Sequence, residues 1–228
     1  GAITVFADIS ALKDTEAAAS ELHRRFDRQR VRLLVLSRAG RALAEPVDMR
    51  TRESALARVL VPDLGDFCVL DVLHEGRLER VALTHADPAR LHEAARLEED
   101  HPGPFAHAAG RALRTGQTYF QPELPDAAHE ANSQDMECQA LAHALGLRSM
   151  LSAPLACHGR VLGTLTLASE SPRVLQPEDA ELAEELAQRL ALSLEQARLL
   201  EEAELARKQL ARMARSTPTA LAVAQSGE

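Results

Sequence analysis

The side chains best suited to chemistry in this sequence are three cysteines and nine histidines, and their spacing limits what they can do. The cysteines Cys68, Cys138 and Cys157 are far apart, odd in number and without a C-x-x-C pair. This pattern argues against a disulfide framework and against a zinc knuckle. Cys68 falls inside an apolar run and Cys157 at a turn between two apolar runs, so structural roles are expected for both.

The histidines are equally scattered. Those in the middle of the chain form no H-x-H or H-x-x-x-H pair; they are His101, His107, His129 and His143. We therefore expect no metal site. The sequence also lacks glycine-rich phosphate loops, the H-E-x-x-H zinc motif and the G-x-S-x-G nucleophile elbow. No catalytic residues are predicted, and we expect that the chain is not an enzyme.

The composition is that of a folded, acidic domain. Hydrophobic residues make up 46% of the 228 residues, which is enough for a packed core. The net charge of −8 and the absence of Trp argue against nucleic acid as a partner. No apolar run approaches the ~18 residues of a membrane span, so we expect a cytoplasmic segment that does not contact a membrane.

Two pairs of apolar segments with alternating character predict β-hairpins. The first pair is 67–73 and 80–86, joined by HEGR, and the second is 148–156 and 161–169, joined by CHGR. A brief extended stretch is expected at 118–120. Helices are expected around these strands at 13–45, 51–61, 88–99, 105–114, within 126–145 (firm from about Gln134) and from 176 onward. The predicted fold is α/β (α+β), an antiparallel sheet flanked by helices.

The first and last helices, 13–45 and 176–214, carry apolar residues at heptad spacing, as in a two-stranded coiled coil. A monomer would leave these apolar seams in water, so we expect a parallel homodimer. From Leu33 onward, packing of the first helix on its own domain is an open alternative. The expected interface residues are Leu22, Phe26, Leu33, Leu36, Leu43, Leu192, Leu199, Leu210 and Met213.

The second hairpin and the helix after it resemble the C-terminal half of a GAF domain. The segment ALGLRSMLSAPLACHGRVLGTLTLAS has the residue types of that family at the family spacing, namely Gly146, Arg148, Ser149, Pro154, Gly159, Gly163 and Leu165. The first half matches more loosely, and the resemblance covers about 30–205. It implies a sheet with a small-molecule pocket on one face, and terminal helices that bundle on the other face and often dimerise.

Both ends of the chain resemble parts of PAS domains. GAITVFADISALKD looks like the last strand of one PAS domain and its exit, and ARSTPTALAVAQSGE looks like the opening of another. The resemblance implies a PAS–GAF–PAS array of the kind found in bacterial sensor histidine kinases, with neighbouring PAS and kinase or other output domains as partners. The expected division is a PAS remnant at 1–12, a linker helix at 13–45, a GAF domain at 46–175, a signalling helix at 176–214 and a PAS start at 215–228.

If a ligand binds, the resemblance places it against the inner strand faces and the variable segment 101–135. The residues expected to line that pocket are Phe67, Val69, Asp71, Phe105, Phe120, Ser152, Pro154 and Thr166. The alternative is that these residues fill a solid core. No cofactor is required, and the ligand is not identified by the sequence.

Two other GAF functions are weighed against a sensory one. A bilin-binding photosensor usually has its cysteine followed by His, whereas Cys138 is followed by Gln139 and lies eight residues before Gly146. A free methionine sulfoxide reductase would use redox cysteines, but long coiled-coil flanks make little sense for such an enzyme. We therefore expect a sensory module that binds a small ligand or relays a signal through dimeric helices.

Overall fold

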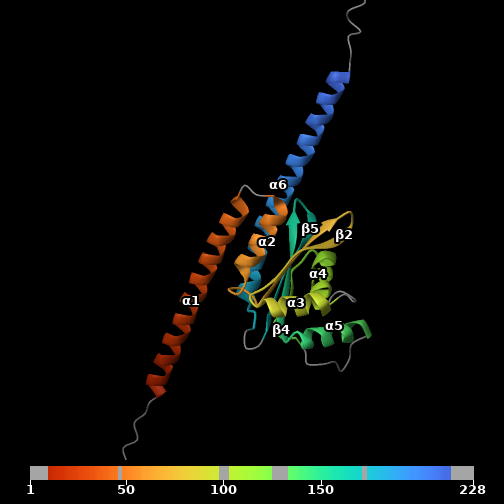
Figure 1. Cartoon of the computed structure of the whole chain (residues 1–228). Helices are drawn as coiled ribbons and strands as arrows, with labels where there is room; N and C mark the ends of the chain where they lie inside the picture. The colour runs from red at the N-terminus through yellow and green to blue at the C-terminus, as the bar shows by residue number, and fades with distance from the viewer. Residues whose placement is uncertain (1–9, 46–47, 98–102, 125–132, 171–173, 217–228) are drawn as a thin grey trace, which may run out of the picture.

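The computed structural model describes residues 10–45, 48–97, 103–124, 133–170 and 174–216 (Figure 1). The terminal segments that resemble PAS domains lie outside these residues, except for 10–14 and 214–216, which are helical. No helix within the described ranges is long and apolar enough to cross a membrane.

A five-stranded antiparallel sheet in the order β2-β1-β5-β4-β3 forms the centre of the molecule. Its strands are β1 (Phe67–His74), β2 (Arg77–His85), β3 (Tyr119–Gln121), β4 (Leu147–Cys157) and β5 (Arg160–Glu170). Both predicted hairpins are confirmed. Each closes through two residues with positive φ, Glu75-Gly76 and His158-Gly159, so pairing starts directly at the turn and the strands are longer than predicted.

The helices are α1 (Ser10–Ala44), α2 (Met49–Leu60), α3 (Pro88–Leu97), α4 (Pro104–Thr115), α5 (Ser133–Ala144) and α6 (Pro177–Ser216). Several boundaries have local causes. The Asp48 carboxylate caps α2 by accepting a hydrogen bond from the Thr51 N–H at 3.0 Å. Gly116 ends α4 in the left-handed conformation, with φ of 65°.

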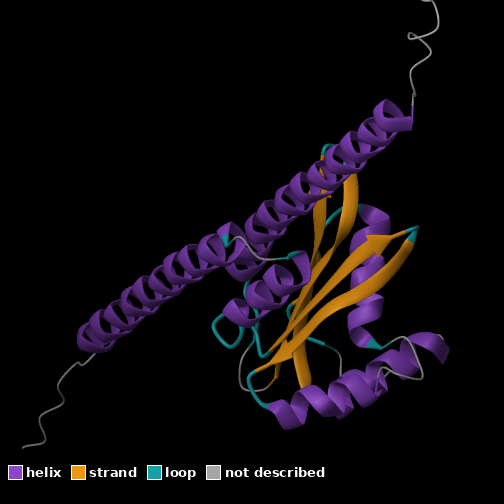
Figure 2. Cartoon of the chain, turned by 45° about the horizontal axis from the view of Figure 1, so that its top comes forward, coloured by secondary structure: helices purple, strands orange, loops and turns teal. Residues whose placement is uncertain are grey.

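The helices lie on the two faces of the sheet (Figure 2). The face with α1, α2 and α6 holds the larger core, which contains Leu56, Leu70, Leu165, Leu186 and Leu190 among others. The opposite face is covered by α4, with α3 and α5 beside it, and it holds a second core around Phe67, Val69 and Phe105. Because side chains alternate along a strand, β1 sends Phe67 to one core and Cys68 to the other.

The two long helices extend past the sheet at opposite ends (Figure 1). Where they overlap, α1 buries Val35 and Ala39, and the Arg32 guanidinium is 3.4 Å from the Glu185 carboxylate of α6. Leu36 and Leu43, expected in a dimer seam, are half-buried against the protein's own core. The other expected interface residues are exposed, and they are Leu22, Phe26, Leu33, Leu192, Leu199, Leu210 and Met213.

Candidate functional site

Helix α4 lies close to the sheet because its inward side chains are small. Ala108, Ala109 and Ala112 are all fully buried, which allows the helix backbone to approach β4 and β5. Its one large inward residue, Phe105, packs on Phe67, with ring centroids 5.4 Å apart. The helix therefore covers the face on which the sequence predicted a pocket.

The strand register brings most of the predicted pocket residues together. Val69 of β1 pairs with Thr166 of β5, which pairs with Ser152 of β4, and the Ser152 and Thr166 hydroxyl oxygens are 2.8 Å apart. Next to these three residues, the row of cross-strand partners on one side contains Phe67. The row on the other side contains Asp71, Thr164 and Pro154. Phe120 is different, because it packs against the larger core on the other face, and Tyr119 faces α4 in its place.

These residues form a packed interior in this conformation. Phe67, Val69, Phe105, Ser152 and Thr166 are fully buried. The alternative raised from the sequence, a solid core under α4, describes this part of the face. Hollows lie instead at its two margins.

One polar pair under α4 lacks full hydrogen bonding. Asp71 is buried and its Oδ1 accepts a hydrogen bond from the Arg80 Nε at 3.1 Å. Its other carboxylate oxygen and the hydroxyl of the paired Thr164 are buried without a hydrogen-bond partner among the described residues. Burial raises the pKa of the Asp71 carboxyl, and the Arg80 guanidinium offsets this only in part.

This raised pKa predicts a pH dependence of stability. The folded protein retains the Asp71 proton at pH values where the unfolded chain releases it, so stability falls as the pH rises from the unfolded pKa toward the raised folded pKa. Asp71→Asn removes this ionisation. We expect its free energy of unfolding, measured by urea titration across acidic to neutral pH, to fall less with rising pH than that of the parent.

The control is Asp63→Asn, which removes a more exposed carboxylate paired with Arg38. It should leave the slope of stability against pH nearly unchanged. A variant at Asp71 with the parent slope would contradict the assignment of a desolvated carboxyl to that position.

At one margin a groove of about 260 Å³ lies between α4, β3 and α5. The Arg111 guanidinium lies over the Tyr119 ring, 5.2 Å from its centroid, and the His107 ring meets Tyr119 edge-on at 6.4 Å. Its described lining residues are Pro104, His107, Arg111, Tyr119, Gln121, Leu124, Cys138, Gln139, Ala142 and Met150. Sequence reasoning did not select Arg111 or Tyr119. The available signal was the four-residue spacing of His107 and Arg111, which places both on one face of a helix.

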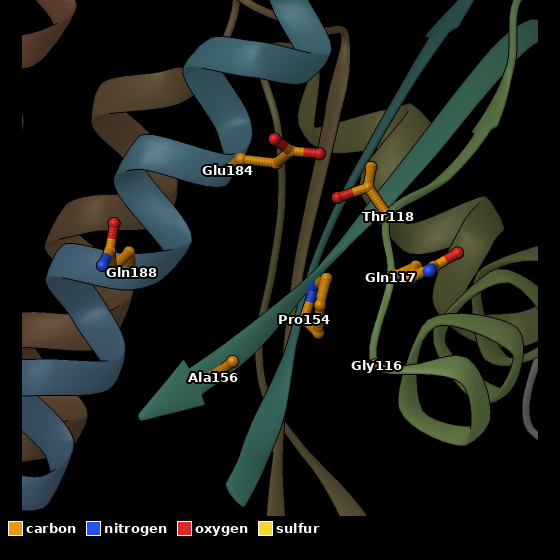
Figure 3. A pocket seen from close by; sticks show the side chains of 7 residues that line it. All are labelled: Gly116, Gln117, Thr118, Pro154, Ala156, Glu184 and Gln188. Carbon is orange, nitrogen blue, oxygen red and sulfur yellow. The ribbon is translucent and has the colours of Figure 1, made fainter. Parts of the chain in front are cut away.

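At the other margin a larger hollow of about 540 Å³ lies along the edge of β4, beyond the residues that pair with β3 (Figure 3). Of the predicted pocket residues, Pro154 lines it. Figure 3 shows Glu184 of α6 directed toward Thr118, across the hollow from Pro154. Most of its other lining residues are exposed, so this hollow is a surface feature.

The cysteines lie in three separate environments and are not joined by disulfides. Burial raises the pKa of the Cys68 thiol strongly, with a smaller contribution from the nearby Asp71, which opposes thiolate formation. Cys157 is buried with its sulfur 3.2 Å from the His158 Nδ1, and Cys138 lines the groove. Within the described ranges, no group of three or more His, Cys, Asp or Glu side chains is placed to hold a metal ion.

The comparisons with known proteins agree with this architecture. The family model for the GAF domain matches residues 16–194, and so includes parts of both long helices. No curated protein matched the sequence.

Solved GAF domains share the fold at low sequence identity. A GAF domain described as part of a sensor histidine kinase from Pseudomonas syringae pv. tomato is 22% identical, with a TM-score of 0.52, over 79% of this chain and 98% of that one. The GAF domain of a phosphoenolpyruvate-protein phosphotransferase from Coxiella burnetii is 15% identical, with a TM-score of 0.54, over 77% and 98% of the two chains. The family model matches most of the sequence, and the strand order and the helices on both faces agree with that match. This chain therefore belongs to the GAF domain family.

Proposed function

We propose that this chain is the sensory module of a bacterial signal-transduction protein, of the sensor histidine kinase type, and that it acts as a parallel homodimer. The GAF domain is a regulatory or sensory fold. A small ligand at the margin of the α4 face would bias the arrangement of the paired helices, and α6 would pass that arrangement to a downstream output domain. Such a bias requires that the ligand bind the two arrangements with different affinity.

The observation that carries this proposal is the exposure of apolar side chains on the two helix extensions. Phe26 of α1 is 61% exposed, and Leu199 and Leu210 of α6 are 51% and 68% exposed. Burying one such side chain fully is worth about 1.5–3 kcal/mol. A second copy of this chain, which presents the same seams, would cover them.

The geometry of the two helices suits a parallel arrangement. In Figure 1, α1 and α6 run in the same general direction along the sheet. A two-fold axis along that direction would pair each helix with its own copy. Leu186 and Leu190 of α6 are buried in the core of the domain, whereas Leu199 and Leu210 are exposed beyond it, so one rigid helix connects the sheet to the extension.

The dimer is tested by light scattering at micromolar concentration. We expect the intact chain at twice its 24.8 kDa mass, and the double variant Leu22→Glu with Phe26→Glu at a lower average mass. Arg28→Glu is the control, because it introduces a glutamate on an exposed position of the same segment outside the apolar spacing. A monomeric intact chain would refute the dimer. An unchanged dimer in the double variant would show that the interface is formed by α6 and not by Leu22 and Phe26.

We also propose that the chain has no catalytic activity of its own. The raised pKa of the Cys68 thiol supports this, since a reductase needs a reactive thiolate. An assay of free methionine sulfoxide reduction decides between a sensory module and a reductase. Cys138→Ser and Cys157→Ser are the controls. Turnover that depends on these thiols would establish the reductase.

A bound ligand can be detected by native mass spectrometry of the purified protein, as a mass above that of the chain.

A further inference from the structure

Among its described lining residues, the groove between α4, β3 and α5 carries charged side chains of one sign only. Arg111 contributes a permanent positive charge, and His107 lies one helical turn earlier on the same face of α4. None of the described residues that line the groove is acidic. By contrast, the larger hollow along β4 includes Glu184 in its lining. Of the two margins, the groove is therefore the one suited to an anion.

The cation in this groove is held in place by an aromatic ring. The Arg111 guanidinium lies 5.2 Å from the centroid of Tyr119, within the range of a cation–π contact. A guanidinium stacked on a ring is restricted in orientation, yet its N–H edge can still donate two parallel hydrogen bonds to a carboxylate. Tyr119 is itself fixed, because β3 pairs with β4 through Tyr119 and Ser152.

The remaining lining supplies apolar contact and a few neutral polar groups. Met150, Leu124, Ala142 and Pro104 provide the apolar surface, and Gln139 provides an amide. Met150 and Ala142 belong to the core of the α4 side, so the groove reaches from the surface to that core. A volume of about 260 Å³ admits a small organic molecule. A bare inorganic ion would fill only a small part of it.

We propose that this groove binds a small organic carboxylate with an apolar body, whose carboxylate is held by Arg111 and whose body lies against Met150, Leu124 and Ala142. This inference rests on the proposed sensory function and names the class of ligand that it would sense. His107 and Gln139 border the groove beside Arg111. Cys138 lies in the same lining.

The test compares carboxylates with neutral molecules of the same shape. Isothermal titration of the intact chain with benzoate and butyrate is matched against benzamide and butyramide, and inorganic phosphate is included as a bare anion. We expect at least one of the two carboxylates to bind, and its amide to bind about tenfold more weakly or not at all, because a charge-assisted hydrogen bond is replaced by a neutral one. Phosphate is expected to bind more weakly than that carboxylate.

The variant is Arg111→Met, which removes the charge and retains an apolar stem against Tyr119. We expect it to weaken carboxylate binding by about tenfold or more. The matched control is Arg114→Met, in the last turn of the same helix and outside the lining of the groove, and it should change the affinity by less than about twofold.

Several results would overturn the inference. They are amides binding as tightly as carboxylates, equal effects of Arg111→Met and Arg114→Met, phosphate binding in preference to both carboxylates, and no binding of either carboxylate. A neutral co-purified ligand that native mass spectrometry detects, and that keeps both carboxylates from binding, would overturn the carboxylate as the ligand and leave the sensory function standing. Carboxylate binding by a chain that is monomeric would leave this site standing and overturn the dimeric relay.

Discussion

Replacing Gly163 with alanine should destabilise the protein by about 3 kcal/mol, near the upper end of the usual cost of overpacking. A Cβ at this position would lie 2.2 Å from the Asp71 carbonyl oxygen and 2.9 Å from the Val72 Cα. Both atoms are backbone atoms of β1, so no side-chain rotation relieves the contact. The strands β1 and β5 would have to separate where Val72 pairs with Gly163.

Gly40→Ala is the matched control for this substitution. Gly40 lies in α1, and a Cβ there would meet nothing within 4 Å. Alanine is better than glycine in a helix interior, so we expect a stabilisation of about 0.5–1 kcal/mol. Urea unfolding of parent and variants at one protein concentration provides the measurement, since stability of an oligomer depends on concentration. A change below about 0.5 kcal/mol for Gly163→Ala would contradict the close approach of β1 and β5.

The parts of the fold that sequence could predict are those with a strong local signal. Both hairpins combine alternating strands with a Gly in a short polar turn, and both were found. Helix α4 was predicted within a residue of its ends, and Gly116 was the local signal for its C-terminus; the structure shows that Pro104 begins it. The strand β3 has only three residues, Tyr119–Gln121, so alternation has no room to show, and only its pairing with β4 defines it as a strand.

The candidate site was predictable only in part, for a related reason. The family resemblance and strand alternation together placed Val69, Ser152 and Thr166 on one face. Which residue of β3 faces α4 depends on the register with β4, and a shift by one residue exchanges Tyr119 for Phe120. The four-residue spacing of His107 and Arg111 puts both on one helix face, but no local signal indicates that the Arg111 guanidinium lies over the Tyr119 ring.

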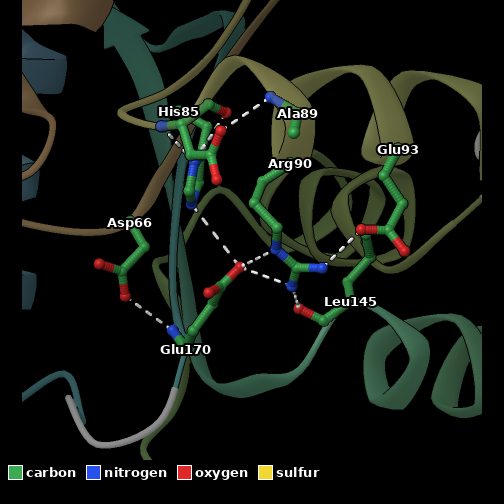
Figure 4. Close-up of polar contacts among 8 residues, drawn as sticks. Asp66, His85, Ala89, Arg90, Glu93, Leu145 and Glu170 are labelled. Atoms are coloured by element: carbon green, nitrogen blue, oxygen red, sulfur yellow. Dashed lines mark hydrogen bonds and ion pairs between the residues drawn. The ribbon is translucent and has the colours of Figure 1, made fainter.

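A second large effect is expected at the end of β5, where a polar cluster joins separate elements (Figure 4). Arg90 of α3 donates two hydrogen bonds to the Glu170 carboxylate, at 2.9 Å from Nε and 2.7 Å from one terminal nitrogen. The same guanidinium contacts the Leu145 carbonyl just after α5 and the Glu93 carboxylate. Glu170 is also held by its backbone N–H, which donates to Asp66 at 2.7 Å.

Arg90→Met should therefore cost about 2 kcal/mol of stability. Arg90 and Glu170 are only about a quarter exposed, at 26% and 25%, so their interaction is less screened than that of a surface pair. Removing the guanidinium also leaves the Leu145 carbonyl without this donor. Hydrogen bonds to charged groups are typically worth about 1.5–3 kcal/mol each, and methionine recovers part of the lost apolar packing.

A double-mutant cycle with Glu170→Gln separates the pair from the rest of the cluster. We expect a coupling energy of about 1 kcal/mol or more between the two substitutions, because Arg90→Met removes the donors of these hydrogen bonds and Glu170→Gln removes the charge that strengthens them. Arg96→Met, on an exposed position of the same helix, is the control and should cost less than about 0.5 kcal/mol. Additive effects of Arg90→Met and Glu170→Gln would show that α3 is not held to the end of β5 by this pair. Glu170 ends the last strand before α6, so strong coupling would establish a physical link from the α3 side of the sheet to the segment that enters the long C-terminal helix.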